Sequence, residues 1–116
     1  KSYDDRVVGT CGISEVNRVG LGGASGVAFR EGTFQFNSDG TLTYTDAAGN
    51  LSSGTWDIRK KNVNHDVIRT LQITAVDFNS QLVKAEFYDE MHFRSTNHFV
   101  AKINNTLRTF VTHFRR

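Results

Sequence analysis

Apolar and polar residues alternate along most of this chain with a period of two. The alternation is clearest between Gly32 and Ile58, where three short runs are separated by Ser38-Asp39-Gly40 and by Ala47-Ala48-Gly49-Asn50. A period of two places successive side chains on opposite faces of a β-strand. Gly, Asp and Asn tolerate the positive φ angles of tight turns, so these separators predict two consecutive β-hairpins.

The same alternation continues to the C-terminus and predicts eight strands. No window shows the i, i+3, i+4, i+7 apolar spacing of an amphipathic helix. Eight strands joined mostly by short turns indicate an all-β barrel or sandwich. Residues 20–26 have the composition of a linker and are expected to form a loop at one mouth of a barrel. The expected strands cover residues 7–16, 27–36, 41–46, 51–59, 66–77, 81–93, 96–103 and 106–115.

The pairing of the last three strands can also be predicted. Placing Phe93 opposite Phe99 brings Glu90 opposite Lys102 on the other face, where opposite charges are favourable. The same register places Arg94 opposite His98. A two-residue turn at Asn104-Asn105 fixes the final hairpin. The pairs expected there are Ile103 with Thr106, Ala101 with Arg108, and Phe99 with Phe110.

Composition narrows the class of protein. A length of 116 residues, 38% apolar content and nine Phe predict one ordered domain over residues 1–116. The net charge is only +2, and the sequence shows no basic stripe, so no nucleic-acid partner is expected. Cys11 is the only cysteine, which excludes an intrachain disulfide and favours a buried thiol. Proline is absent, so every backbone N–H can join a ladder, as suits a closed barrel.

Three blocks of sequence resemble the bacterial lipocalin-like domain proteins. They are Gly32-Thr33-Phe34-Gln35-Phe36-Asn37-Ser38-Asp39-Gly40-Thr41-Leu42, then Ser53-Gly54-Thr55-Trp56-Asp57-Ile58, and the closing Phe114-Arg115-Arg116. The resemblance extends over nearly the whole chain and implies an all-β, eight-stranded antiparallel up-and-down barrel. It also implies an exported protein at the periplasm, outer membrane or cell surface, often held by a lipid anchor at a removed N-terminus. The chain begins at Lys1 rather than Met, which agrees with a processed form.

The first strand departs from the family pattern. Lipocalins carry Gly-x-Trp there, and the Trp packs on an Arg of the last strand. The corresponding residues here are Gly9-Thr10-Cys11, so the stacking of a guanidinium on an indole is lost. We expect Arg115 or Arg116 to be the partner Arg and Trp56 to fill part of the vacated volume.

An eight-stranded barrel either fills with side chains or holds one small ligand. The ligand-binding residues that we predict are Phe34, Phe36, Tyr44, Trp56, Phe87, Met91, Phe99, Arg108 and Phe110. Leu42, Ile58, Leu71, Ile73 and Phe114 are expected to point inward with them. Such a wall suits a small apolar or amphipathic molecule, oriented by Arg30, Arg69 or Arg108. The alternative is an interior in which these groups pack only on each other.

No constellation of catalytic or metal-binding residues stands out. The four histidines show no metal-ligand spacing, and neither a metal site nor a cofactor is expected. Asp89 and Glu90 point to opposite faces of a strand, and no nucleophile motif occurs, so we do not expect an enzyme. The first hypothesis is therefore a binding barrel. The second is an envelope module with a filled barrel that docks a protein or glycan through outward Leu107, Val111 and Val100 around His98 and His113.

Overall fold

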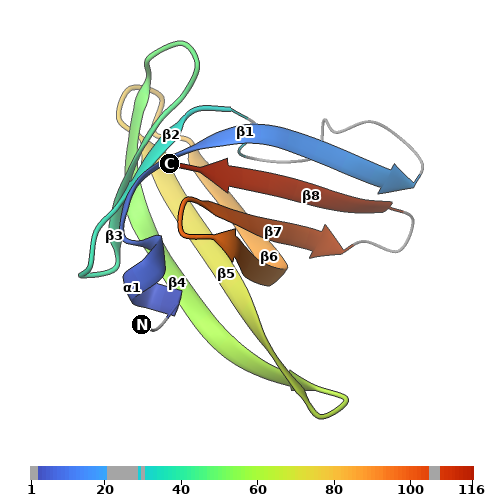
Figure 1. The fold of residues 1–116 in the computed structure, drawn as a ribbon. Helices are drawn as coiled ribbons and strands as arrows, with labels where there is room; N and C mark the ends of the chain where they lie inside the picture. The colour runs from blue at the N-terminus through green and yellow to red at the C-terminus, as the bar shows by residue number, and fades with distance from the viewer. Residues whose placement is uncertain (1–2, 21–28, 30, 105–107) are drawn as a thin grey trace.

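The chain folds into a single closed β-barrel in the computed structural model, which describes residues 3–20, 29, 31–104 and 108–116 (Figure 1). One short helix, α1 (Tyr3–Val7), precedes the strands. These are β1 (Gly9–Gly20), β2 (Thr33–Phe36), β3 (Thr41–Thr45), β4 (Leu51–Val63), β5 (Asp66–Asp77), β6 (Val83–Ser95), β7 (His98–Asn104) and β8 (Arg108–Arg115). Within these residues, no helix is long and apolar enough to cross a membrane.

The topology confirms the predicted eight-stranded up-and-down barrel. Every strand pairs antiparallel with the next one along the chain, and β1 pairs with β8 to close the sheet. One end of the barrel carries α1, the turns after β2, β4 and β6, and the C-terminal Arg116. The other end carries the β1–β2 connection and the turns that follow β3 and β5. We call these the α1 end and the loop end.

The two predicted hairpins between Thr33 and Thr55 are confirmed. In the first turn, Gly40 has a φ of 88°, and the Asp39 carboxylate accepts a hydrogen bond from the Thr41 N–H at 3.0 Å. The Thr41 hydroxyl donates to the same carboxylate at 2.6 Å. Both hydrogen bonds lower the pKa of Asp39, and the one from the hydroxyl has the larger effect. Gly40 therefore supplies the positive φ angle of the turn, and Asp39 caps its backbone, as the sequence pattern predicted.

The second strand is shorter than expected. It begins at Thr33, whereas the apolar pattern placed its start at Val27. Residues 27, 28 and 30 lie outside the described part of the chain. Phe29 is described, lies outside any strand and is fully buried. Phe29 thus joins the core from the β1–β2 connection rather than from a described strand.

The β6–β7 register is confirmed over most of its length. Phe93 lies opposite Phe99 and Glu90 opposite Lys102, with the two charged groups 3.9 Å apart. The expected pairing of Arg94 with His98 is wrong, because an irregularity after Phe93 brings Ser95 opposite His98.

The predicted register of the final hairpin is wrong. Ile103 pairs with Phe110, Ala101 with Thr112 and Phe99 with Phe114. The reason is that β7 extends to Asn104, which pairs with Thr109, so the connection is longer than a two-residue turn. The register moves by an even number of residues, so Phe110 and Phe114 still face inward as expected.

Gly54 is required by the close approach of β4 to β5. A Cβ atom placed on Gly54 would lie 1.7 Å from the Thr74 carbonyl oxygen. We expect Gly54→Ala to lower the free energy of unfolding by about 3 kcal/mol, since the backbone of β5 must shift to admit it. Urea denaturation measures the change, with the exposed neighbour Ser53→Ala as a control expected to stay within about 0.5 kcal/mol. A Gly54→Ala variant as stable as the control would contradict the close approach.

Candidate functional site

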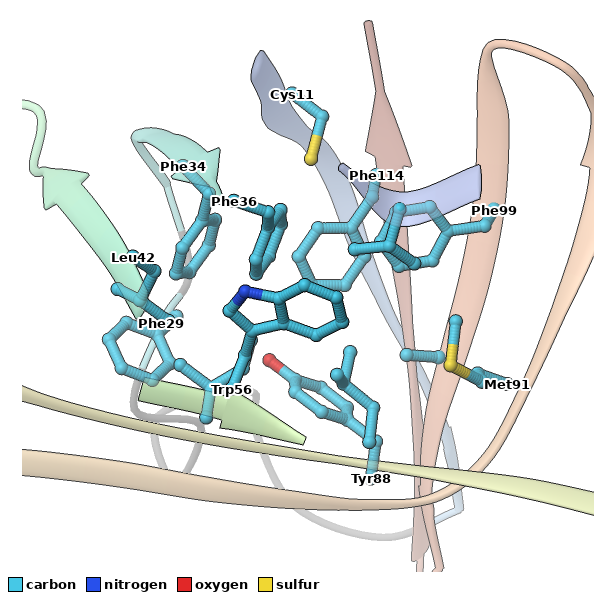
Figure 2. Packing of buried hydrophobic residues seen from close by; sticks show 14 of the residues in the cluster. Cys11, Phe29, Phe34, Phe36, Leu42, Trp56, Tyr88, Met91, Phe99 and Phe114 are labelled. Atoms are coloured by element: carbon cyan, nitrogen blue, oxygen red, sulfur yellow. The ribbon is translucent and has the colours of Figure 1, made fainter. Parts of the chain in front are cut away.

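The interior of the barrel is the place where most of the predicted ligand-binding residues meet (Figure 2). Seven of them belong to one buried hydrophobic cluster: Phe34, Phe36, Tyr44, Trp56, Met91, Phe99 and Phe110. Leu42, Leu71, Ile73 and Phe114 are buried with them as expected, and Ile58 is partly buried against the cluster. Their position inside the barrel is thereby established, whereas their contact with a ligand stays a prediction.

Phe87 is the exception, and its predicted inward position is wrong. Its side chain is 48% exposed, while the adjacent Tyr88 is fully buried. The cause is a bulge in the β5–β6 ladder, where Arg69 pairs with Met91 but Leu71 pairs with Tyr88. An extra residue in one strand reverses the inward and outward positions beyond it. Counting back from Met91 in steps of two therefore placed Phe87 inside the barrel, whereas Tyr88 is the residue that points inward.

Arg108 cannot be placed in the same way. It begins β8, but its side chain lies outside the described part of the structure, and so does Arg30. Arg69, the third candidate for orienting a ligand, is half-buried opposite the inward Met91.

Stacked and edge-on aromatic rings fill the part of the interior nearest the α1 end. Phe34 stacks on Phe36 with ring centroids 5.1 Å apart, and Phe99 stacks on Phe114 at 4.5 Å. Phe34 also meets Phe114 at 5.8 Å, which joins the two stacks across the barrel. Figure 2 shows these rings converging around Trp56. Offset and edge-on ring pairs add stabilisation beyond the area that they bury.

Trp56 has a structural anchor. Its indole N–H lies 3.0 Å from the carbonyl oxygens of both Asn37 and Thr41. The edge of the Phe36 ring approaches the indole at 5.6 Å. Since the N–H is already satisfied by the β2–β3 turn, Trp56 offers a ligand only its apolar surface.

Phe29 belongs to the interior but was not among the predicted site residues. Its ring packs edge-on against Tyr44 at 4.9 Å and against Phe34 at 5.3 Å. It therefore plugs the barrel interior from the β1–β2 connection. In the sequence, Phe29 follows a glycine-rich segment, and the alternating pattern placed it in the strand expected over residues 27–36.

Two hydroxyl groups deep in the barrel have no hydrogen-bond partner among the described residues. They belong to Tyr88 on β6 and Thr112 on β8, and both side chains are fully buried. Burial raises the pKa of Tyr88, and the negative charge of Glu86 raises it further, so the phenol remains a neutral donor. Buried hydroxyls without partners are costly, and each such group in a folded protein calls for an explanation.

Charged side chains enter the barrel near the loop end. Lys84 and Glu86 lie on the inward side of β6 and are half-buried. The Lys84 ammonium lies 5.9 Å from the ring centroid of Tyr44. The Tyr44 phenol donates to the Glu31 carbonyl oxygen, and burial raises its pKa to about 12. Toward the loop end, charged groups thus join the aromatic rings of Tyr44 and Phe29 in the interior.

The α1 end is held by two arginines. The Arg6 guanidinium lies 4.0 Å above the Phe93 ring, and Arg116 donates to the carbonyl oxygens of Val8 and Arg6. A Cβ on Gly9 would lie 2.8 Å from the Arg116 guanidinium. Arg116 therefore approaches Gly9, whereas Arg115 Nε donates to the Ser14 hydroxyl at 3.0 Å.

Two pockets lie on the surface of the described part. One, of about 520 Å³, is lined by Asp5, Arg6, Val8, Thr96 and Arg116 at the α1 end. The other, of about 410 Å³, lies between the β4–β5 hairpin and β6. Neither is lined by the aromatic residues of the interior.

A pair of histidines lies on the outer face of β7 and β8. His98 Nε2 and His113 Nδ1 are 2.9 Å apart, and the Asn17 side chain lies 3.3 Å from His113 Nε2. Val100 beside them is fully buried, which corrects the expected exposed patch of Val100, Val111 and Leu107. Leu107 itself lies outside the described residues. Among the residues described, no group of three or more His, Cys, Asp or Glu could hold a metal ion.

Stability should fall below neutral pH because of His98 and His92. Burial and then the charges of Arg115, His113 and Arg94 lower the pKa of His98, and burial and then Lys102 and Arg94 lower that of His92. A histidine with a lowered folded pKa binds fewer protons folded than unfolded. Its contribution is full above about pH 6.5 and declines as the pH falls below that value.

Urea denaturation at a series of pH values tests this. His98→Gln should reduce the slope of stability against pH in that window, because one titrating group is gone. The aspartates with lowered pKa, such as Asp39 and Asp77, act only below about pH 4 and do not interfere. A wild-type stability that stays constant between about pH 7 and pH 5 would contradict the expectation.

Cys11 should be unreactive in the folded protein. Its side chain is buried, and burial raises the pKa of its thiol to about 12, which removes the thiolate that reacts with disulfide reagents. We expect labelling at neutral pH only at the rate of unfolding, rising to completion in denaturant. Rapid labelling of the native protein would show that the strand β1 is open at this point.

No family model, curated protein or solved structure matches this chain, so the resemblance carried by its motifs stays a prediction.

Proposed function

We propose that this protein is a non-enzymatic binding barrel that holds one small apolar or amphipathic molecule in its interior. Its closed, aromatic-lined sheet is the kind of scaffold that suits such a ligand. The binding region is the part of the barrel between the aromatic stacks and the loop end, where Tyr88, Thr112 and the charged inward residues of β6 lie.

The unpartnered hydroxyls of Tyr88 and Thr112 are the observation that carries this proposal. Ligand sites combine apolar walls with a few polar groups that fix the orientation of the bound molecule. A phenol and an aliphatic hydroxyl, both fully buried on the inward sides of β6 and β8, are groups of that kind. A ligand with one or two hydrogen-bonding atoms on an apolar body would satisfy them.

The surrounding residues support the size and character of that ligand. The stacked rings of Phe34, Phe36, Phe99 and Phe114 occupy the volume near α1 and restrict the ligand to the rest of the interior. Lys84 and Glu86 lie inward nearer the loop end, where a polar or charged terminus of the ligand would emerge. An amphipathic molecule of modest size fits this order of surfaces better than a long hydrocarbon chain does.

The chemistry of the described residues favours binding over catalysis. Cys11 is held as a thiol by its raised pKa, and the pair of His98 and His113 lies on the outer face, away from the barrel interior. A nucleophile with an adjacent base is the usual signature of covalent catalysis. We extend the proposal to location: the motifs that resemble lipocalin-like domains favour an exported protein, with a lipid anchor at a removed N-terminus.

Titration of the Trp56 fluorescence with fatty acids, retinoids and small aromatic probes tests the proposal, because Trp56 is the only tryptophan. Tyr88→Phe and Thr112→Val should each weaken the best probe by roughly tenfold, since each removes about one hydrogen bond, near 1.4 kcal/mol. Both variants should leave the free protein as stable as wild type or more stable, because an unpartnered buried hydroxyl is removed.

The two readouts separate ligand binding from a structural role. If the hydroxyls only support the fold, both variants lose stability and probe affinity is unaffected. Ser53→Ala on the outer face is the control and should change neither quantity. Probes that leave the fluorescence of the wild-type protein unchanged would contradict the binding barrel.

A further inference from the structure

Two arginines and a histidine lie together on the outer face of the sheet, near the α1 end. His98 on β7 pairs with Arg115 on β8, and Ser95 on β6 lies opposite His98 on its other side. Arg94 lies at the irregularity that follows Phe93 in the β6–β7 ladder, and both arginines are exposed. Irregularities of this kind re-aim a side chain and are frequent beside functional sites. We call Arg94, His98 and Arg115 the outer-face cluster.

The positive charges of both arginines reach His98. Burial first, and then the charges of Arg115, His113 and Arg94, lower the pKa of His98. Burial, then Lys102 and Arg94, lower the pKa of His92, which lies on the same face. Both histidines are therefore surrounded by cations, and this electrostatic reach agrees with the positions that the strand register gives to the cluster.

No carboxylate neutralises the cluster within the part of the chain that the structure describes. Neither arginine forms an ion pair with a described acidic residue. Glu15 on β1 shares the outer face but lies opposite His113, one row of side chains away. Glu90 lies on the same face with Lys102 at 3.9 Å. The outer-face cluster therefore keeps an excess of positive charge that an anion would neutralise.

Arg115 is held in position by β1. Its Nε donates to the Ser14 hydroxyl at 3.0 Å. Ser14 lies where the β1–β8 register shifts, between Ile13 and Glu15. The remaining N–H groups of the Arg115 guanidinium have no hydrogen-bond partner among the described residues. Such N–H groups form a planar fork that matches the oxygen atoms of a phosphate.

A chain of hydrogen bonds makes His98 a donor. The amide nitrogen of Asn17 lies 3.3 Å from His113 Nε2, and an amide nitrogen only donates, so Nε2 accepts. His113 then carries its proton on Nδ1 and donates to His98 Nε2 at 2.9 Å. The proton of neutral His98 therefore lies on its Nδ1, which has no partner among the residues described.

We propose that Arg94, His98 and Arg115 bind a phosphate group on the outer face of the barrel. Arg115 supplies its fork, His98 Nδ1–H supplies a single donor, and Arg94 supplies the second positive charge. A phosphate group carries roughly two negative charges and three strong acceptor oxygens at neutral pH. A carboxylate carries one charge and has fewer acceptors. The phosphate group belongs either to a soluble phosphate compound or to the headgroup of an acidic phospholipid.

This site is independent of the ligand proposed for the barrel interior, because it lies on the opposite side of the sheet. The interior hydroxyl of Tyr88 takes no part in it. Tyr88→Phe should therefore leave phosphate binding unchanged, and failure of either proposal leaves the other standing.

Binding should be coupled to the protonation of His98. A bound anion opposes the positive charges of Arg94 and Arg115 and favours the imidazolium form. The pKa of His98 should therefore be higher in phosphate than in chloride at the same ionic strength. A titration of the histidine signals by NMR measures this rise. The signals of His65, in the turn between β4 and β5, should not respond to phosphate.

The test titrates isotope-labelled protein with inorganic phosphate at neutral pH and constant ionic strength, followed by NMR. The wild-type signals of the cluster should move and saturate. Arg94→Gln and Arg115→Gln should each weaken binding by roughly tenfold or more, since each removes a charged partner. Arg59→Gln is the matched control, because Arg59 is also exposed but lies beside Asp57 on β4, and it should bind as the wild type does. Acetate should bind at least about tenfold more weakly than phosphate.

A second arm distinguishes the two sources of the phosphate group. Sedimentation with vesicles that contain phosphatidic acid is compared with sedimentation with vesicles of phosphatidylcholine alone. Retention on the first kind only, lost in both arginine variants, assigns a phospholipid headgroup. Binding of inorganic phosphate without retention on vesicles assigns a soluble phosphate compound. Both results support the site.

Three results overturn the proposal. The first is a wild-type protein that binds neither inorganic phosphate nor the acidic vesicles. The second is binding that both arginine variants retain in full. The third is acetate binding as strong as phosphate binding. Nitrogen NMR shifts that show His98 Nδ1 without a proton at neutral pH overturn its role as a donor. Thermal unfolding of each variant confirms that it is folded.

Discussion

Closure of the sheet by the β1–β8 ladder is the constraint on which the rest of this structure depends. Once the sheet is closed, every alternate side chain is committed to an enclosed volume that must be filled or shared with a ligand. Phenylalanines from β2, β7 and β8 fill the part near α1, and Phe29 reaches in from the connection between β1 and β2. The arginines at the α1 end and the anchored Trp56 fix the strands around that packing.

The packing inside the barrel also follows from this closure. Inside, the Tyr88 and Thr112 hydroxyls are buried without hydrogen-bond partners among the described residues, although the Tyr88 ring packs edge-on against Phe114 at 5.8 Å. These two hydroxyls support the proposal of a bound ligand.

The sequence predicted the elements that local chemistry determines. The turns around Asp39-Gly40 and Gly49, the strand count and most of the inward residues follow from turn residues and a period of two. Phe87 was misplaced because a bulge changes the alternation, and a bulge depends on the partner strand rather than on local sequence. The last hairpin was misregistered by an even shift, which hydrophobic alternation cannot detect. Phe29 and the unpartnered hydroxyls arise only when distant segments meet, so no local pattern could have indicated them.

Whether the interior holds a molecule is the central claim, and a native mass spectrum of the protein purified from its own host tests it most directly. The account predicts a non-covalent adduct of small-molecule mass that is present under native conditions and lost on denaturation. Substitution of Tyr88 by Phe should reduce the fraction of protein that carries the adduct. A spectrum with only the bare polypeptide mass, at native and denaturing conditions alike, would contradict the account.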